Sequence, residues 1–349
     1  MTTPPSNLIP DAVREAFGIT PNATATRIPS GLINLSWLVE SPDKKIVLQR
    51  LHEIFPAQVN EKIDGVTQFL ASREFKTTRL VATVNNELQF SFGGHNWRAL
   101  SYVKGTTHQA LRDTTQARSA ARLLARFHEL MGDYPRAASL PNASVHNVAT
   151  HEEKLKKALV VHAGHRNFSE ITEVASEILR LIKTLTPLPI FPTVVIHGDP
   201  KISNFLFDET DQAAYLIDLD TIGRGQLLHE LGDAFRSWCN PRGEDISDTA
   251  FEVEFFEAAL SEYHAHCGKR IDKSQLRYTP LATQTIYLEL AARFCADALN
   301  ESYFGWNADQ FPTSSEHQLM RARGQLNAAK ALAAQRKEIN DVVERLALE

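Results

Sequence analysis

The stretch VVIHGDPKISNFLFDETDQAAYLIDLDTIGRG, residues 194–225, combines short apolar runs with polar residues at their ends. The run VVI leads into HGD and ends at Asp199, FLF follows Asn204, and YLI leads into Asp218. Short apolar runs that are bounded by turn residues predict β-strands. We therefore expect a β-hairpin that carries a group of polar side chains at one end.

The expected register of this hairpin places two oxygen donors side by side. If Phe207 lies opposite Tyr215, antiparallel pairing puts Asn204 opposite Asp218. Directly opposite residues have Cβ atoms about 4.5–5.5 Å apart. Amide and carboxylate oxygens suit Mg²⁺, which takes one or two protein carboxylates and completes its shell with water and phosphate. We therefore predict that Asn204 and Asp218 hold Mg²⁺.

Two side chains just before Asn204 fit the transfer of a phosphoryl group. Asp199 could accept the proton of an attacking hydroxyl, and Lys201 could stabilise the group in transfer. Turn and cap chemistry is one alternative, since Asp and Asn favour turns. A second alternative is the DLD metal motif of nucleotide-sugar glycosyltransferases, although no doubly wound nucleotide-binding domain precedes it.

The composition of the chain is that of an ordinary globular protein. Of its 349 residues, 43% are hydrophobic and 23% charged, which suffices for a core, and the length favours at least two domains. A net charge of −5 without a Lys/Arg stripe argues against a nucleic-acid partner. Three cysteines without a CxxC pair favour a reducing compartment. No leader pattern and no long apolar run is present, so we expect a cytoplasmic protein without a membrane partner.

The periodicity of the chain changes near residue 104. Before it, strand patterns at 24–28, 36–40 and 46–50 and in LQFSF and WRALSYV accompany helix patterns at 11–17 and 56–72. After it, helical patterns dominate, beginning with a capped helix between Asp113 and Gly132. We therefore predict an α+β protein with a β-rich N-terminal lobe, residues 1–103, and a mainly helical C-terminal lobe, residues 104–349.

The motif HGDPKISN followed by IDLD resembles the catalytic loop and metal motif of kinases, most closely those of the aminoglycoside phosphotransferases and choline kinases. Five further segments are similar to N-acetylhexosamine 1-kinases: SGLINLSWLV, IVLQRLHEIFP, IDLDT, ELGDAFRS and RFCADALNESYF. The resemblance implies a two-lobed protein-kinase-like fold, ATP and Mg²⁺ as cofactors, and transfer of the γ-phosphoryl group to a hydroxyl of a small molecule. Asp199 would be the catalytic base, and Lys201 would match the lysine of the kinase loop.

The same resemblance assigns the N-terminal lobe to ATP. Leu48 would line the adenine pocket, Arg50 would reach the phosphates in place of the usual lysine, and Glu61 would pair with Arg50. An exposed arginine, an exposed glutamate and an ordinary hairpin turn in SGLINL are the alternatives. The predicted ATP-binding residues are Ser30, Gly31, Asn34, Leu48, Arg50, Glu61, Ser101 and Val103.

Four side chains of the C-terminal lobe are assigned to the acceptor: Asp220, Arg236, Arg293 and Asp297. Asp233 shares a helix face with Arg236 and would anchor the catalytic loop; a local ion pair is the alternative. Glu289 stands four residues before Arg293, and Asp297 four after it. This spacing fits either the lining of a sugar pocket or a helical ladder of salt bridges.

The nature of the acceptor follows from how these charges alternate. Acids interleaved with arginines favour a neutral sugar, best an N-acetylhexosamine phosphorylated at its anomeric hydroxyl. Trp238 and Trp306 could stack on a sugar, although core packing is the expected role of each. An aminoglycoside, choline or homoserine as acceptor is the nearest alternative. A catalytically inactive nucleotide- or sugar-binding module is an alternative of a different class.

Overall fold

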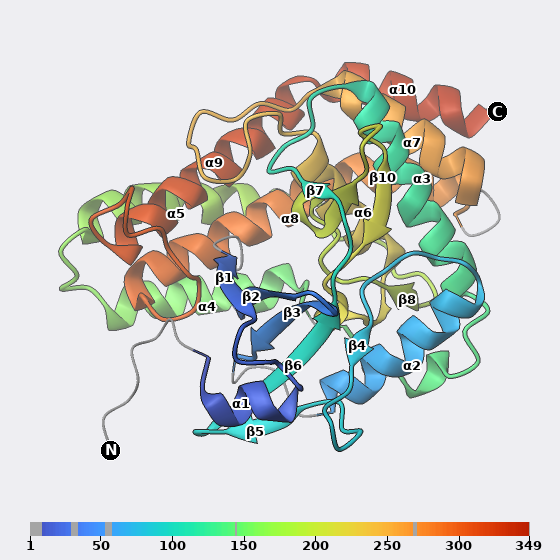
Figure 1. Cartoon of the computed structure of the whole chain (residues 1–349). Helices are drawn as coiled ribbons and strands as arrows, with labels where there is room; N and C mark the ends of the chain where they lie inside the picture. Colours follow the sequence, from blue (N-terminus) through green and yellow to red (C-terminus); the bar gives the residue numbers. More distant parts are fainter. Residues whose placement is uncertain (1–8, 29–33, 53–57, 144, 268–270, 349) are drawn as a thin grey trace. The chain divides into compact units, whose positions relative to one another are not determined.

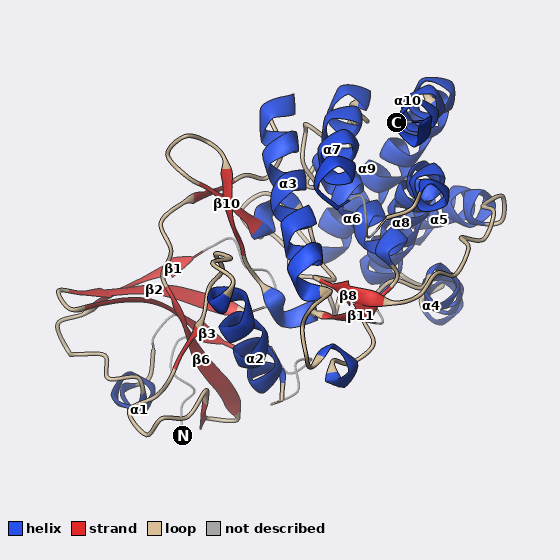
Figure 2. Ribbon diagram, turned by 90° about the vertical axis from the view of Figure 1, so that its right-hand side faces the viewer, coloured by secondary structure: helices blue, strands red, loops and turns tan. Residues whose placement is uncertain are grey.

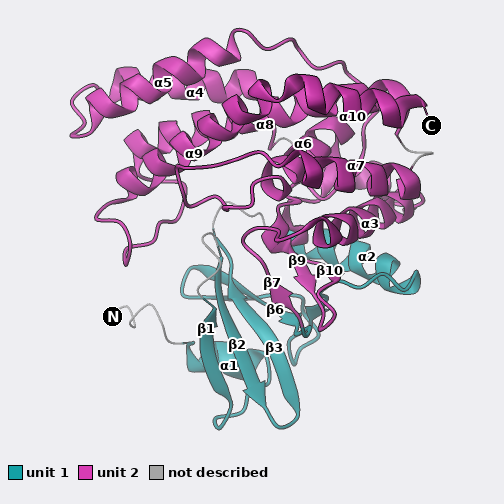
Figure 3. Ribbon diagram, turned by 90° about the horizontal axis from the view of Figure 1, so that it is seen from above, with its two compact units in different colours: residues 1–104 teal, residues 105–349 magenta. Residues whose placement is uncertain are grey.

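The computed structural model describes residues 9–28, 34–52, 58–143, 145–267 and 271–348. The internal contacts of the chain divide it into two compact units, Met1–Lys104 and Gly105–Glu349 (Figure 3). More residues lie in strands than in helices in the first unit, and helices form most of the second unit, which confirms the predicted α+β class.

A six-stranded antiparallel sheet, counted over the described residues, forms the first unit (Figure 1). Its strands follow the order β1-β2-β3-β6-β4, and β5 pairs with β6. The strand patterns predicted at 24–28, 36–40 and 46–50 are confirmed as β1, β2 and β3. The elements of this unit are α1 (Asp11–Ala16), β1 (Thr24–Ile28), β2 (Leu35–Ser41), β3 (Lys44–Arg50), α2 (Val59–Ser72), β4 (Leu80–Val81), β5 (Phe90–Phe92) and β6 (His95–Ser101).

The core of the first unit lies between this sheet and α1. Side chains alternate between the faces of a strand, so Trp37 and its pairing partner Leu48 point to the same side. Phe17, which follows α1, joins them in one buried cluster. The rings of Trp37 and Trp97 stack with their centroids 5.5 Å apart. One face of the sheet is therefore committed to apolar packing.

The second unit is a group of helices with two small sheets (Figure 2). Strands β7, β9 and β10 form one sheet, and β8 pairs with β11 in the other. The strands are β7 (Thr106–Thr107), β8 (Val194–Ile196), β9 (Phe205–Phe207), β10 (Ala213–Leu216) and β11 (Gly223–Gly225). The α-helices are α3 (Thr114–Met131), α4 (Val148–Val161), α5 (Phe168–Ile182), α6 (Leu227–Trp238), α7 (Val253–Cys267), α8 (Lys273–Asn300), α9 (Ser314–Ala334) and α10 (Arg336–Leu348).

Helix α8 is the centre of the second unit. It packs against α4, α5, α6, α9 and α10, and 20 of its 28 residues are buried. A helix that is covered on most sides by other helices lies inside the protein, and its buried polar side chains need partners there. Its start is set by a capping box, in which Asp272 and Gln275 each bond the other's backbone N–H. Among the helices in the described part of the chain, none is both long enough and apolar enough to cross a membrane.

Candidate active site

The β9–β10 hairpin forms, but with a register different from the predicted one. Phe207 pairs with Ala213, Leu206 pairs with Tyr215, and an irregularity lies between these two pairs. A bulge inserts an extra residue into one strand and shifts the pairing beyond it. Asn204 consequently accepts a hydrogen bond from the N–H of Ile217, at 2.9 Å, and Asp218 is the next residue along. The expected pairing of Asn204 with Asp218 is wrong by one residue, although the two remain neighbours.

The loop after β8 brings three of the predicted residues into direct contact. Lys201 Nζ lies 2.5 Å from Asp199 Oδ2. The amide nitrogen of Asn204 donates to the backbone oxygen of Asp199 at 2.8 Å and to Oδ2 at 3.2 Å. Both donors to the carboxylate thus end on Oδ2, and within the described part of the chain Oδ1 receives no hydrogen bond. The side chain of Asp199 is 27% exposed, so Oδ1 is the oxygen left for another partner.

The electrostatics of this loop keep Asp199 and Lys201 charged. Burial alone would raise the pKa of Asp199, but Lys201 and Arg236 lower that pKa to about 2. Burial alone would lower the pKa of Lys201, but the negative charges of Asp199 and Asp218 raise it. The two side chains therefore form a persistent ion pair near neutral pH.

Asp218 occupies a left-handed backbone conformation, with φ 66° and ψ 59°. Residues other than glycine rarely adopt this region, and Asp and Asn tolerate it best. The turn redirects the chain from β10 into the short helical turn Leu219–Thr221, in which Asp220 is buried. Backbone conformations of this kind are enriched at functional sites.

Helix α6 holds residues 197–202, the predicted catalytic loop, through three side chains on one face. The carboxylate of Glu230 accepts the N–H groups of His197, at 2.7 Å, and Gly198, at 2.9 Å. Ser237 accepts the N–H of Ile202, and the indole of Trp238 donates to the oxygen of Pro200. Trp238 is 1% exposed, so its expected core role is confirmed.

The anchor of the loop predicted at Asp233 is therefore Glu230 instead. Asp233 pairs with Arg236 on its own helix, with 2.7 Å between carboxylate oxygen and Nε. The alternative of a local ion pair is the arrangement found. Glu230 was not assigned a role from the sequence, although it is the first residue of the segment ELGDAFRS, and that segment was the available signal.

His197 and Gly198 shape the loop rather than expose reactive groups. The ring of His197 is fully buried, contacts the oxygen of Ile217 through Nε2, and accepts the N–H of Asp199 at Nδ1. Gly198 has φ 86°, and a Cβ there would lie 2.6 Å from the backbone oxygen of Thr221. Only glycine fits both conditions.

Arg236, which we predicted to bind the acceptor, is buried between two acids. Its side chain is 4% exposed and pairs with Asp233 and Glu244. A guanidinium whose donors are taken by protein carboxylates is not available to a substrate. Its positive charge instead helps to lower the pKa of Asp199. The assignment of Arg236 to the acceptor is corrected to a buried counter-ion of the site.

The predicted ladder Glu289–Arg293–Asp297 is absent from the described residues. Glu289 accepts from His146 Nδ1, at 2.9 Å, and Arg293 lies over the ring of Phe304, 5.4 Å from its centroid. Arg293 is only half-buried and remains a candidate for the acceptor.

Asp297 closes a turn instead of facing a pocket. Its oxygens accept the backbone N–H groups of Ser302, Tyr303 and Phe304 at 2.8–3.1 Å, and the side chain is 3% exposed. This buried carboxylate is held by three backbone donors, so the structure gives Asp297 a structural role in the turn and does not support its assignment to the acceptor. The same loop leaves Trp306 37% exposed, which contradicts its expected core packing.

In the first unit, the two side chains of β3 that we predicted to bind ATP lie on the face of the strand that packs into the apolar core. Leu48 is fully buried in the apolar cluster with Trp37, so it lines no open pocket. Arg50 follows on the same face, because alternate residues of a strand share a face. Glu61 is exposed, and over the described residues no ion pair joins it to Arg50.

The side chains that reach α2 are different ones. Arg98 on β6 is 1% exposed and donates to Gln49, at 2.8 Å, and to Asn60 at the start of α2, at 3.3 Å. This network was not predicted from the sequence. The indication available there was an isolated arginine within the strand segment WRALS.

The remaining residues predicted to bind ATP have structural contacts or lie outside the description. Asn34 Oδ1 accepts the N–H of His52, which ties the ends of β2 and β3 together. Ser101 accepts the N–H of Arg79, and Val103 lies beyond the end of β6. Ser30 and Gly31 fall outside the described residues.

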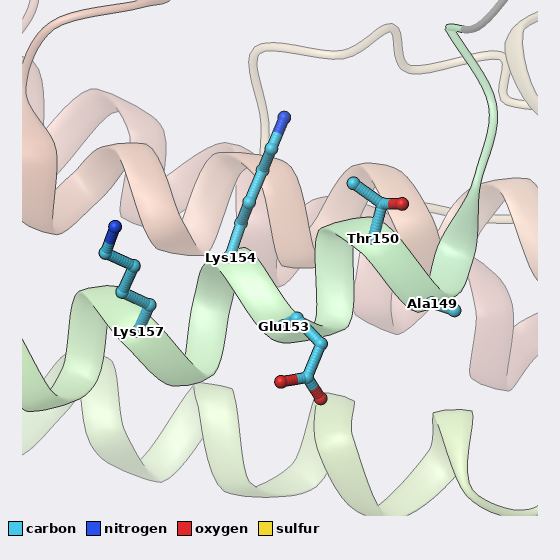
Figure 4. A pocket seen from close by; sticks show the side chains of 5 residues that line it. All are labelled: Ala149, Thr150, Glu153, Lys154 and Lys157. Atoms are coloured by element: carbon cyan, nitrogen blue, oxygen red, sulfur yellow. The ribbon is translucent and has the colours of Figure 1, made fainter.

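An open depression of about 590 Å³ lies on the surface of α4 (Figure 4). It includes none of the predicted site residues, and all of its lining side chains are exposed. These are Ala149, Thr150, Glu153, Lys154 and Lys157. An open surface of one helix does not provide the enclosure typical of an acceptor site.

Comparisons with known proteins place the chain in a family. Residues 24–266 match the profile of the phosphotransferase enzyme family. Among solved structures, an amicoumacin kinase in complex with AMP-PNP and Ca²⁺ is similar with a TM-score of 0.60 at 11% identity, over 90% of this chain and 91% of that one. A spectinomycin phosphotransferase in complex with ADP and its substrate has a TM-score of 0.59 at 13% identity, over 93% and 97%.

A choline kinase from Cryptosporidium parvum is similar with a TM-score of 0.59 at 14% identity, over 96% of this chain and 98% of that one. These likenesses establish the two-lobed kinase-like fold, and the family match covers well over half of the sequence. The chain therefore belongs to the phosphotransferase enzyme family.

Proposed function

We propose that this phosphotransferase transfers the γ-phosphoryl group of ATP to a hydroxyl of a small molecule, with Mg²⁺ as the metal. The observation that carries the proposal is the contact set of Asp199, Lys201 and Asn204 beside the turn at Asp218. Residues 1–103 would bind the nucleotide, and residues 104–349 would carry the catalytic loop and bind the acceptor. The amicoumacin kinase and spectinomycin phosphotransferase structures, which hold AMP-PNP and ADP, support the choice of nucleotide.

The donor set fits Mg²⁺. The amide nitrogen of Asn204 is committed to Asp199, which leaves Oδ1 as its ligand atom. Asp218 supplies a carboxylate next to it. Mg²⁺ takes few protein ligands and relies on substrate phosphates, which agrees with the absence of any cluster of three acidic, His or Cys ligands among the described residues. Bound there, the ion would neutralise charge on the phosphates of ATP.

The proposed chemistry assigns one role to each side chain. Asp199 is ionised because its pKa lies near 2, so its Oδ1 accepts a hydrogen bond from the acceptor hydroxyl and directs that oxygen at the γ-phosphorus. A new P–O bond forms, the bond to the β-phosphate oxygen breaks, and ADP leaves. The hydroxyl proton passes to Asp199 and then to solvent. Lys201 contributes positive charge where the transferring group becomes more anionic.

For the acceptor, an N-acetylhexosamine or related hexose phosphorylated at its anomeric hydroxyl is the best-supported choice. The buried charges around His146 alternate in sign, since Glu289 and Asp233 are interleaved with Arg236 and Arg293. A cationic acceptor such as choline would favour a surplus of acids. The exposed rings of Tyr303 and Trp306, at 49% and 37%, offer apolar faces of the kind that a sugar ring can cover.

The test is ATP consumption by the purified protein with a panel of acceptors: free hexoses, N-acetylhexosamines, choline, homoserine and aminoglycosides. We expect turnover with an N-acetylhexosamine and a product that has lost its reducing end. Asp199→Asn should lower kcat at least about 10²-fold while the Kd of ATP changes little. Turnover of choline or an aminoglycoside alone would replace the sugar assignment. A wild-type protein that transfers phosphate to no acceptor would support the inactive binding module.

A further inference from the structure

A buried chain of three side chains from three helices ends at the peptide that precedes Asp199. The hydroxyl of Tyr263 on α7 lies 2.7 Å from Nδ1 of His128 on α3. Nε2 of His128 lies 3.1 Å from Oε1 of Glu230 on α6. Each of the three residues is at most 5% exposed. Buried polar groups are costly unless paired, and here each is paired with the next.

The chemistry of the groups fixes where the protons lie. Burial opposes the ionisation of Glu230, but hydrogen bonding and the nearby histidines hold its pKa below the ordinary value. An ionised carboxylate only accepts hydrogen bonds, so Nε2 of His128 donates to it. Burial raises the pKa of Tyr263 well above its usual value, so its hydroxyl keeps its proton beside Nδ1 of His128.

We propose that His128 and Tyr263 are positioning residues for the catalytic loop and act through the carboxylate of Glu230. The inference rests on the proposed function, in which Asp199 is the catalytic residue. Oε1 of Glu230 accepts hydrogen bonds from the backbone N–H of His197 and from Nε2 of His128. Oε2 accepts the backbone N–H of Gly198. Without His128, the carboxylate of Glu230 loses one of these three hydrogen-bond donors, and its rotation is less restricted.

A change in the position of the Glu230 carboxylate would affect both Asp199 and Asp218. His197 accepts the N–H of Asp199 at one ring nitrogen and contacts the oxygen of Ile217, the residue before Asp218, at the other. A shift of the His197–Gly198 peptide therefore moves the carboxylate of Asp199 and the turn of Asp218 together. Misplacement of reacting groups by about 1 Å can cost on the order of 10²-fold in rate.

Two substitutions of His128 separate positioning from packing. In His128→Gln the amide nitrogen can occupy the place of Nε2 and still donate to Glu230. In His128→Asn the shorter amide reaches only the place of Nδ1, beside Tyr263. We expect His128→Asn to lower kcat about 10- to 100-fold with KM values for ATP and acceptor within about twofold, and His128→Gln to recover most of kcat. Tyr263→Phe should lower kcat several-fold, because it frees the ring of His128 to turn.

A second measurement does not depend on activity. Amide hydrogen exchange of the segment around His197 and Gly198 should be faster in His128→Asn than in wild type, and near wild type in His128→Gln. The matched control is Thr283→Val, which removes a fully buried hydroxyl on α8 that bonds only within its own helix. It should reduce Tm but leave kcat and exchange at His197 unchanged.

The outcomes distinguish this inference from the proposed function. If Asp199→Asn is inactive but His128→Asn retains wild-type kcat and exchange, the inference is wrong and the proposed function stands. Equal losses of kcat in the Gln and Asn variants would also overturn it, because packing alone would then explain both. If Asp199→Asn keeps its activity, the proposed function fails, and the exchange data still decide whether His128 holds the loop. Should His128→Asn not fold, Tyr263→Phe and His128→Gln supply the same comparison.

Discussion

At the scale of single residues, the candidate site depends on which atom of each side chain is already occupied. Asp199 uses Oδ2 for Lys201 and Asn204, and Asn204 uses its amide nitrogen for Asp199. Asp199 Oδ1 and Asn204 Oδ1 are the oxygens that remain for the proposed acceptor and the proposed metal ion. Asp297 shows the opposite case, since its oxygens are consumed by the protein's own backbone.

The first prediction concerns the metal ligands. Asn204→Ala and Asp218→Ala should each raise the Mg²⁺ concentration needed for half-maximal activity, by about 10- to 100-fold. The measurement is a Mg²⁺ titration at fixed ATP, with thermal unfolding as the check that each variant folds. Unchanged titrations in both folded variants would remove these residues from the metal site.

The second prediction separates Arg293 from Asp297. Arg293→Ala should cost about 1–3 kcal/mol in kcat/KM for the acceptor with little change in ATP binding, because a polar group of the sugar loses its partner. Asp297→Ala should mainly lower Tm, because three backbone N–H groups lose their acceptor. Steady-state kinetics and unfolding midpoints of the two variants make the comparison. A purely structural effect of Arg293→Ala would contradict the acceptor role.

At the scale of elements, α6 determines the shape of the catalytic loop. Glu230, Ser237 and Trp238 recur at helical spacing, so one helix face presents two acceptors and one donor to successive loop peptides. Gly232 on the same helix allows close packing, since a Cβ there would lie 2.8 Å from the backbone oxygen of Ala282 on α8. The loop is therefore supported by a helix that is itself fixed against the central helix.

The third prediction tests the junction between β8 and this loop. Gly198→Ala forces a side chain into a conformation with φ 86° and toward the oxygen of Thr221. The conformation alone costs about 1–2 kcal/mol, and the collision adds to it. We expect a lower Tm and a lower kcat, measured by calorimetry and initial rates. Gly164→Ala is the control, because a Cβ there meets no atom within 4 Å; equal behaviour of the two variants would contradict the argument.

At the scale of the whole molecule, neighbouring acids connect parts of the second unit that are distant in sequence. Glu244 pairs with Arg236 beside the catalytic loop, and Asp245 pairs with Arg321 and His317 on α9. Arg321 also donates to the oxygen of Gly305, in the loop that follows α8. The segment between α6 and α7 thus links the loop of Asp199 to the C-terminal helices.

The fourth prediction is a pH dependence of stability. Burial would raise the pKa of Asp245, but His317 and Arg321 hold it well below its usual range. Because the folded pKa is depressed, the stabilisation is complete above the unfolded pKa of about 3.9 and is lost as pH falls through the folded value. Asp245→Asn should lower Tm at pH 7 and show a smaller decline in Tm below about pH 4 than wild type.

The control for this prediction is Asp309→Asn, which removes an exposed carboxylate outside the network. Tm is measured by thermal unfolding from neutral to acidic pH for all three proteins. A decline for Asp245→Asn that parallels wild type would show that the carboxylate contributes nothing to acid sensitivity. The effect should be moderate, since the side chain of Asp245 is about half exposed and water screens the pair.

Sequence alone determined the elements and the composition of the catalytic loop. Strands β1 to β3 and helix α3 follow from local periodicity and caps, and the cluster of Asp199, Lys201 and Asn204 follows from residues that are near in sequence. Local patterns succeed here because hydrogen bonds and alternation act over a few residues. Even so, the hairpin closes at Phe207 and Ala213 instead of Phe207 and Tyr215, and the irregularity between Ala213 and Tyr215 leaves the pairing near Asn204 one residue from the prediction, because apolar alternation reveals neither the turn length nor an inserted residue.

Tertiary structure alone decided which side chains are available to a ligand. Arg236 and Asp297 looked suitable for the acceptor and Leu48 for ATP, yet packing gave the two charged residues protein partners and buried Leu48 in the core. His128 and Tyr263 belong to no quoted motif, and they meet Glu230 only because α3, α6 and α7 pack together. The physical reason is that a buried polar group must be satisfied by whatever the fold brings to it, and that partner can stand more than a hundred residues away in the chain.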